Sequence, residues 1–203
     1  MLVAASGLVM PSIAAAEPVS IVALGDSLTA GYGLAPGQSF PEQLEQALQA
    51  RGHDVTVANA GVSGDTASDG LARLEWSVPA EADAVIVELG ANDALRGINP
   101  SVTRTALAGI LEKLRARGQP VLVAGMLAPR NLGAEYAAAF DAIYPELAEE
   151  YGARRYPFFL DGVAADSSLN QGDGIHPTAA GVARIVEVIL PDVEKLIEDA
   201  KAD

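Results

Sequence analysis

A serine, a histidine and an aspartate in this 203-residue chain have the types and surroundings that nucleophilic catalysis requires. Ser27 stands in the tetrapeptide Gly-Asp-Ser-Leu, directly after the apolar run 19–24, where a buried strand would end in a turn. His176 is one of two histidines, and Asp173 precedes it by three residues. A serine hydroxyl becomes a nucleophile when a base removes its proton, and an imidazole with a pKa near ~6.5 can do this at neutral pH. The three residues therefore predict a Ser-His-Asp triad.

A triad of this kind also needs hydrogen-bond donors for the negative charge that develops on the substrate oxygen. The carboxyl ends of parallel strands meet at one edge of a sheet, so donors are expected after neighbouring strands. The backbone N–H of Ser27 can supply one. The backbone N–H of Gly64 and the side-chain amide of Asn92, which follow the next two apolar runs, are the other candidates.

Five short apolar runs alternate with longer stretches of helical period, which is typical of parallel strands joined by crossover helices. The predicted strands are 19–24, 55–59, 84–89, 120–125 and 156–160. The predicted helices are 38–51, 101–117, 133–151 and one that Pro177 opens, which Pro191 interrupts before a short charged continuation over 192–203. These elements predict an α/β fold, a three-layer α/β/α sandwich with a flavodoxin-like five-stranded parallel sheet in the order 2-1-3-4-5.

Composition limits the classes of function. The 27 acidic and 13 basic residues give a net charge of -14, which repels nucleic acid and anionic membrane surfaces. The chain has no cysteine, which excludes disulfides, a thiolate nucleophile and a thiolate zinc site. Its length predicts one domain, over 17–203, after the N-terminal segment. The oligomeric state does not follow from these features.

The segment 1–16 has the pattern of a secretory leader. An apolar run over 2–10 precedes the small residues Ala14, Ala15 and Ala16, which signal peptidase accepts. The apolar run is too short to span a bilayer as a stable helix, which takes about 20 residues. Because no Lys or Arg precedes it, a flexible tail or a true start further upstream is the competing interpretation. We expect a periplasmic or secreted protein.

The motif residues occur in a recognisable order. Gly25-Asp26-Ser27-Leu28, Gly64, Asn92 and Asp173-x-x-His176 resemble the four sequence blocks of the SGNH (GDSL-type) hydrolases. The segments 60–66, 88–93 and 125–131 are similar to the branch of that family that holds arylesterases, thioesterase I and lysophospholipases. The resemblance covers nearly all of the chain after the leader.

This resemblance implies Ser27 as nucleophile, His176 as base and Asp173 as the residue that orients it. It implies Ser27, Gly64 and Asn92 as oxyanion donors, and the use of no metal or organic cofactor. The implied substrates are small-molecule or lipid esters and thioesters, with the acyl chain in a groove bordered by 94–99 and 127–132. Candidate substrate-binding residues are Asp26, Leu127, Pro129 and Ile175, and Arg130 is a departure expected to alter substrate choice.

Other interpretations remain open on the sequence. Asp26 and Asp65 can brace the loops instead of binding substrate, and Tyr32 and Trp76 can line the groove or only pack. A carbohydrate O-acetyl esterase is the nearest rival among enzymes, although only 5% of the chain is aromatic. A catalytically silent binding protein and a flavin mononucleotide carrier are the rivals outside enzymes; the carrier is favoured only weakly, by the segment 27–33.

Overall fold

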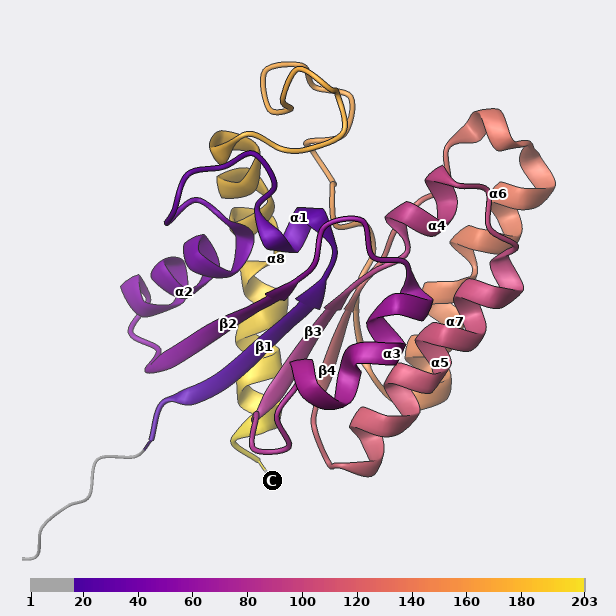
Figure 1. The fold of residues 1–203 in the computed structure, drawn as a ribbon. Helices are drawn as coiled ribbons and strands as arrows, with labels where there is room; N and C mark the ends of the chain where they lie inside the picture. Colours follow the sequence, from indigo (N-terminus) through magenta and orange to yellow (C-terminus); the bar gives the residue numbers. More distant parts are fainter. Residues whose placement is uncertain (1–16, 203) are drawn as a thin grey trace, which may run out of the picture.

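A computed structural model describes residues 17–202, so the predicted leader lies outside the described residues. Its five strands form one parallel sheet in the order β2-β1-β3-β4-β5, which confirms the predicted fold class (Figure 1). The strands are β1 (Val19–Gly25), β2 (Val55–Gly61), β3 (Ala84–Glu88), β4 (Val121–Ala124) and β5 (Arg154–Tyr156). β1 and β3 lie at the centre, and almost all their side chains are buried because both faces of the sheet are covered.

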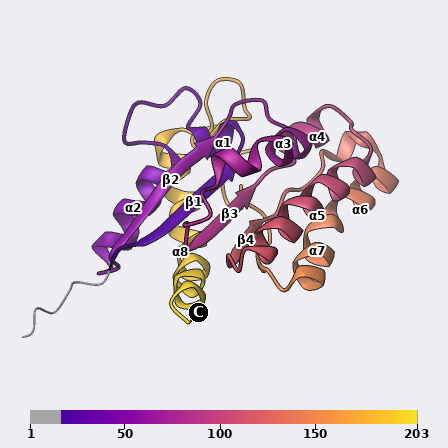
Figure 2. The same ribbon diagram turned by 60° about the horizontal axis from the view of Figure 1, so that its bottom comes forward.

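Helices cover both faces of the sheet. Helix α2 (Phe40–Ala50) packs against α8 (Ala179–Ala200) on one face, and α3 (Ala67–Ser77), α5 (Pro100–Ala116) and α7 (Ile143–Tyr151) lie on the other (Figures 1 and 2). Helix α6 (Ala134–Asp141) precedes α7. Three one-turn elements follow the carboxyl ends of strands: α1 (Ser27–Ala30), α4 (Ala91–Leu95) and the 3₁₀ helix η1 (Arg130–Leu132). In residues 17–202 no helix has the length and apolarity to cross a membrane.

The fifth strand is earlier and shorter than predicted. It pairs with β4 only through Arg154, Arg155 and Tyr156, whereas the sequence predicted 156–160. The ladder ends at Pro157, where the chain bends after the N–H of Gly125 has donated to the carbonyl of Tyr156. The N–H of Phe159, two residues further on, donates to the carbonyl of Gly125. The apolar side chains after Pro157 therefore leave the sheet and become available to the cavity described below.

Prolines also change two of the predicted helices. The predicted helix 133–151 is interrupted at Ala142, because Pro145 cannot donate to the carbonyl of Asp141. The last helix begins at Ala179, and the hydroxyl of its N-cap Thr178 accepts from the N–H of Gly181.

Pro191 does not interrupt α8, contrary to the prediction. A proline inside a helix costs about 3 kcal/mol. Beyond it, Val193, Leu196 and Ile197 are buried in the core, and each buried apolar side chain contributes about 1.5–3 kcal/mol. Burial of this last part of the helix therefore outweighs the missing hydrogen bond.

Candidate active site

Ser27 lies at the sharp turn that follows β1. The carboxylate of Asp26 caps α1 by accepting the N–H of Leu28 at 3.0 Å, so that Ser27 begins the helix at the carboxyl edge of the sheet. Gly25 allows this turn, since a Cβ there would lie 2.0 Å from the hydroxyl oxygen of Thr29. The glycine and the acidic cap of the motif thus both serve to place the serine.

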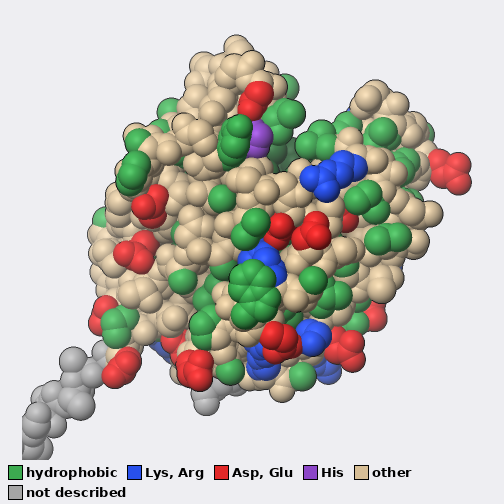
Figure 3. Space-filling model, in the orientation of Figure 1, with side chains coloured by type: hydrophobic (Ala, Val, Ile, Leu, Met, Phe, Trp, Pro, Cys, Tyr) green, Lys and Arg blue, Asp and Glu red, His purple; other side chains and the backbone are tan. Residues whose placement is uncertain are grey.

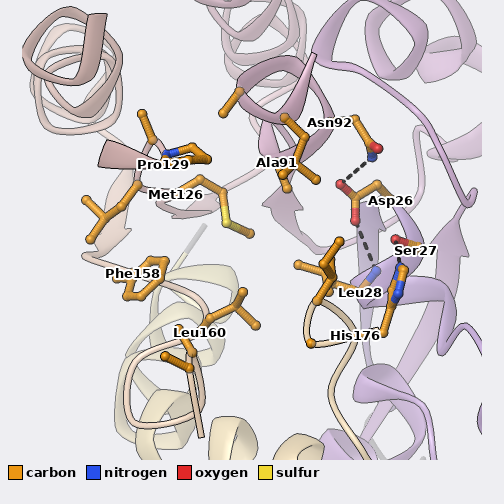
Figure 4. A pocket seen from close by; sticks show the side chains of 18 of the residues that line it. Asp26, Ser27, Leu28, Ala91, Asn92, Met126, Pro129, Phe158, Leu160 and His176 are labelled. Atoms are coloured by element: carbon orange, nitrogen blue, oxygen red, sulfur yellow. Dashed lines mark hydrogen bonds between the residues drawn. The ribbon is translucent and has the colours of Figure 1, made fainter. Parts of the chain in front are cut away.

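His176 connects Ser27 to Asp173. Its Nε2 lies 2.9 Å from the Ser27 Oγ (Figure 4), and its Nδ1 lies 2.7 Å from Oδ2 of Asp173. The other Asp173 oxygen accepts the backbone N–H groups of Ile175 and His176, at 2.9 and 3.0 Å. These hydrogen bonds hold the pKa of Asp173 well below its ordinary value, and the bond from the His176 N–H has the largest effect. A carboxylate beside Nδ1 favours the tautomer in which Nε2 can accept the serine proton.

Asn92, the second residue of α4, lies beside this turn. Its Nδ2 donates to Oδ2 of Asp26 (Figure 4) and to the carbonyl of Asp65, both at 3.0 Å. Gly64 lies in the turn after β2 with φ +90°, and its carbonyl accepts from Nη2 of Arg96 at 2.8 Å. Asn92 lines the cavity next to Ser27, whereas Gly64 is not among the residues that form the cavity wall.

Two buried carboxyl groups lie beneath the serine. Asp26 is fully buried, and burial raises its pKa to about 6 against the opposing hydrogen bonds from Leu28 and Asn92. Glu88, at the end of β3, is also fully buried, and burial together with the nearby Asp26 charge raises its pKa well above the usual range. The hydroxyl of Thr29 donates to its Oε2 at 2.7 Å. Asp26, a candidate both for substrate binding and for bracing the loops, holds Leu28 and Asn92 and also lines the cavity described next.

An apolar cavity of about 680 Å³ opens beside Ser27 and His176. In Figure 4, Met126, Phe158 and Leu160 lie on the opposite side of the cavity from the serine and the histidine. The space-filling view shows the same edge of the molecule hollowed, with hydrophobic side chains on the walls (Figure 3). The remaining wall residues that the sequence singled out are Leu127, Pro129, Arg130 and Ile175. The cavity suits an apolar chain whose reacting end points at Ser27.

Arg130 and Tyr32 take definite places at this site. Nη1 of Arg130 is 2.8 Å from Oδ2 of Asp141, whose other oxygen accepts the N–H of Ala128, so the arginine is fixed at the cavity wall. The Tyr32 ring packs on the His176 imidazole, with 4.6 Å between ring centroids. Trp76 is 75% exposed on α3 and is not part of the wall.

Several residues of the site could not be found from the sequence. Phe158 and Leu160 were assigned to a strand, since an apolar run has the same appearance in a strand and in a cavity wall. Gln171 contacts both the Ser27 turn and the His176 loop, but a single glutamine carries no sequence signal except its nearness to Asp173. Among residues 17–202, no three His, Asp or Glu side chains converge as a metal site would require.

Comparison with known proteins agrees with this geometry. A model of the GDSL-like lipase/acylhydrolase family matches residues 23–184. Esterase TesA of Pseudomonas aeruginosa is 40% identical over 185 residues, 91% of each chain. Thioesterase 1/protease 1/lysophospholipase L1 of Escherichia coli is 36% identical over 191 residues, 94% of this chain and 90% of that protein.

A solved structure gives the same result at the level of the fold. The crystal structure of AlinE4, an SGNH-hydrolase family esterase, is 49% identical with a TM-score of 0.76, over 90% of this chain and 98% of that chain. The residues that match the family model include Ser27, Asp173 and His176, which are joined by hydrogen bonds. This chain therefore belongs to the GDSL-like lipase/acylhydrolase family and is a serine ester hydrolase.

Proposed function

We propose that Ser27 attacks the carbonyl carbon of an ester while His176 takes the hydroxyl proton, and that the alcohol leaves after receiving this proton. The product is an acyl-serine, which water hydrolyses with His176 acting as base again. Asp173 orients the imidazole and stabilises its charged form. The observation that supports this mechanism is the series of hydrogen bonds from Asp173 through His176 to Ser27, which ends at the mouth of an apolar cavity.

The oxyanion is proposed to form beside the Ser27 N–H, with Asn92 and the Gly64 N–H as the other donors. Both hydrogens of the Asn92 amide are already directed at Asp26 and the Asp65 carbonyl. The oxyanion would therefore share one of these hydrogens. A donor whose orientation is fixed before the reaction stabilises the developing charge without reorganising, and each such donor is worth about 3–4 kcal/mol.

The proposed substrates are esters with an apolar acyl chain, including aryl esters, thioesters and lysophospholipids. The apolar wall supports the acyl chain, and the names of the related esterases and thioesterases support the range of leaving groups. A carbohydrate O-acetyl esterase would need polar groups to bind a sugar. The cavity wall, formed by side chains such as Met126, Phe158 and Leu160, favours the acyl chain.

We propose that the chain is exported and that cleavage after Ala16 leaves a periplasmic or secreted enzyme starting at Glu17. The support is the apolar run followed by small residues in 1–16. Cell fractionation and the mass of the purified protein test this. A full-length chain that stays in the cytoplasm would contradict it.

The proposed mechanism is tested by hydrolysis of p-nitrophenyl esters from acetate to long acyl chains. Ser27→Ala should lower kcat by about 10³-fold or more, because the members of a triad act as a unit. Ser101→Ala is the matched control, since this hydroxyl binds only the Asn99 side chain at the exposed start of α5. Activity retained in Ser27→Ala would refute the nucleophile. Release of acetate from acetylated sugars, with no hydrolysis of longer acyl esters, would move the assignment to the rival esterase.

A further inference from the structure

Gln171 joins the two segments that carry Ser27 and His176. Its Nε2 donates to the carbonyl of Tyr32 at 2.7 Å and to the carbonyl of Pro177 at 2.9 Å. Its backbone N–H donates to the carbonyl of His176 at 2.7 Å. Tyr32 follows the helix turn that Ser27 begins, and its own N–H donates to the Ser27 carbonyl at 3.1 Å. The side-chain amide of Gln171 therefore links the backbone of the serine turn to the backbone directly after the histidine, while its backbone N–H holds the carbonyl of the histidine itself.

The serine turn leaves space for this amide at Gly33. A Cβ at position 33 would lie 2.3 Å from Oε1 of Gln171, and the backbone there has φ +75°. The ring of the adjacent Tyr32, a residue that is 54% exposed, packs against the His176 imidazole. Gln171 thus bonds the backbone of the histidine loop, and Tyr32 contacts the imidazole from the serine turn.

The hydrogen bond between Asp173 and His176 cannot by itself set the distance to Ser27. These two residues lie in the same short loop, so their bond fixes the imidazole within that loop. The distance between imidazole and hydroxyl depends in addition on how the loop sits against the turn after β1. The position of the loop against the turn would be set by a hydrogen bond between the two segments in which neither the Ser27 hydroxyl nor the imidazole takes part.

We propose that Gln171 is the positioning residue that holds the His176 loop against the Ser27 turn. The proposal rests on the proposed roles of Ser27 and His176. Proton transfer requires the hydroxyl and Nε2 at hydrogen-bond distance, here 2.9 Å, and a displacement of about 1 Å can cost about 100-fold in rate. Gln171 touches neither reacting atom and is not itself part of the cavity wall, so its effect should appear mainly in kcat.

The first test replaces Gln171 with methionine, which keeps the length of the side chain and removes both donors. The matched control is Gln119→Met. Gln119 also donates from its amide to two backbone carbonyls, those of Pro79 and Ala82, at 3.0 and 2.8 Å, and it precedes β4 at the edge of the sheet opposite to Ser27. Both variants lose two hydrogen bonds of the same chemistry.

We expect Gln171→Met to lower kcat by about 10- to 100-fold with KM changed less than about threefold. The rate at which a p-nitrophenyl phosphonate labels Ser27 should fall in parallel. Gln119→Met should lower the thermal midpoint to a similar extent and keep kcat within about twofold. Wild-type kcat in Gln171→Met, or equal losses of kcat in the two variants, would overturn the proposal.

A second pair of variants gives the answer even if Gln171→Met fails to fold. Gly33→Ala directs a methyl group at the Gln171 amide, whereas Gly37→Ala, at φ +84° in the same loop, meets no atom within 4 Å. Both substitutions place an alanine at a positive φ, which destabilises each variant in the same way. A difference in kcat between the two variants therefore measures the displacement of Gln171. Gly33→Ala should lose the larger part of kcat, and equal kcat in the pair would contradict the proposal. If Ser27→Ala stays active, the proposed function itself fails, whatever these pairs show.

Discussion

At the scale of single residues, Asp26 is subject to two opposing influences. Burial disfavours its charged form and raises its pKa to about 6, while the Leu28 N–H and the Asn92 amide donate to the carboxylate and favour the charge. At neutral pH the residue is therefore ionised and holds Asn92, and this ionisation lowers the stability of the fold. The position of a proposed oxyanion donor is maintained at the expense of stability.

Because ionised Asp26 destabilises the fold, the stability of the protein should depend on pH. The folded protein keeps the Asp26 proton up to about pH 6, whereas the unfolded chain releases it near ~3.9, so the folded state binds more protons between these values. The stability contributed by Asp26 is therefore present below the unfolded pKa and lost as pH rises through the folded pKa. Relative to Asp26→Asn, the wild type should lose roughly 1 kcal/mol of unfolding free energy from about pH 5 to about pH 7.5.

Urea unfolding of both proteins at these two pH values measures the difference. The lower pH lies above the isoelectric point of about 4.4, which keeps the protein charged. Contributions of the carboxyl groups away from Asp26 largely cancel between wild type and variant, and Glu88, whose pKa the Asp26 charge raises, is replaced by glutamine in both proteins. A difference that stays constant with pH, or one that changes in the opposite direction, would show that Asp26 is already ionised at the lower pH.

Asn92 should act mainly in the transition state. Asn92→Ala removes the amide that lies between Asp26 and the Asp65 carbonyl. We expect kcat to fall by about 100-fold or more and KM to change little, because the substrate carbonyl acquires its charge only during the reaction. Steady-state kinetics on one p-nitrophenyl ester measures both constants, and a rise in KM with normal kcat would instead make Asn92 a substrate-binding residue.

At the scale of elements, the sheet and its order followed from the alternation of apolar runs with helical period, and that prediction is confirmed. The errors came from residues whose effect depends on tertiary packing. The apolar side chains of Phe158 and Leu160 cover a cavity instead of a sheet, which a run of apolar residues cannot reveal. Pro145 divides a predicted helix, whereas Pro191 leaves α8 continuous because residues beyond it are buried.

The predicted site residues were easier to find than their neighbours. Ser27, Asp173 and His176 belong to motifs with a fixed spacing, and the structure joins them by hydrogen bonds from Asp173 through His176 to Ser27. Gln171 and Glu88 contact the same turn through the fold alone. Such contacts have no local pattern, since they depend on how segments far apart in the sequence pack together.

Replacing Pro191 is expected to stabilise the protein. It lies on the exposed side of α8, so Pro191→Ala should restore a helical hydrogen bond without filling the core. We expect the free energy of unfolding to rise by about 1 kcal/mol or more, with kcat unchanged. Urea unfolding measures the free energy of unfolding, and hydrolysis of a p-nitrophenyl ester measures kcat. A loss of stability would mean that a bend at Pro191 is needed to pack Leu190 and Val193.

At the scale of the whole molecule, the net charge of -14 should influence which leaving groups approach the site. A thioester of coenzyme A carries several negative charges and is repelled, whereas a neutral p-nitrophenyl ester is not. Raising the ionic strength from about 10 to about 150 mM shortens the Debye length from roughly 30 to roughly 8 Å.

The value of kcat/KM for the coenzyme A thioester should therefore rise severalfold over this range, while that for the neutral ester stays constant. Stopped-flow or steady-state measurements on the same enzyme preparation provide both values. A fall with salt for the thioester would show that a local positive group such as Arg130 attracts the leaving group more strongly than the overall charge repels it.

The hydrogen bond between Ser27 and His176 joins residues that are 149 positions apart. During synthesis the serine turn leaves the ribosome long before its base, and the hydroxyl has no partner until most of the chain has followed. An incomplete chain consequently cannot hydrolyse cellular esters. Ester hydrolysis can thus serve as a reporter of complete synthesis and folding, and two fragments divided at an exposed loop between the motifs should be inactive alone and active only on reassembly.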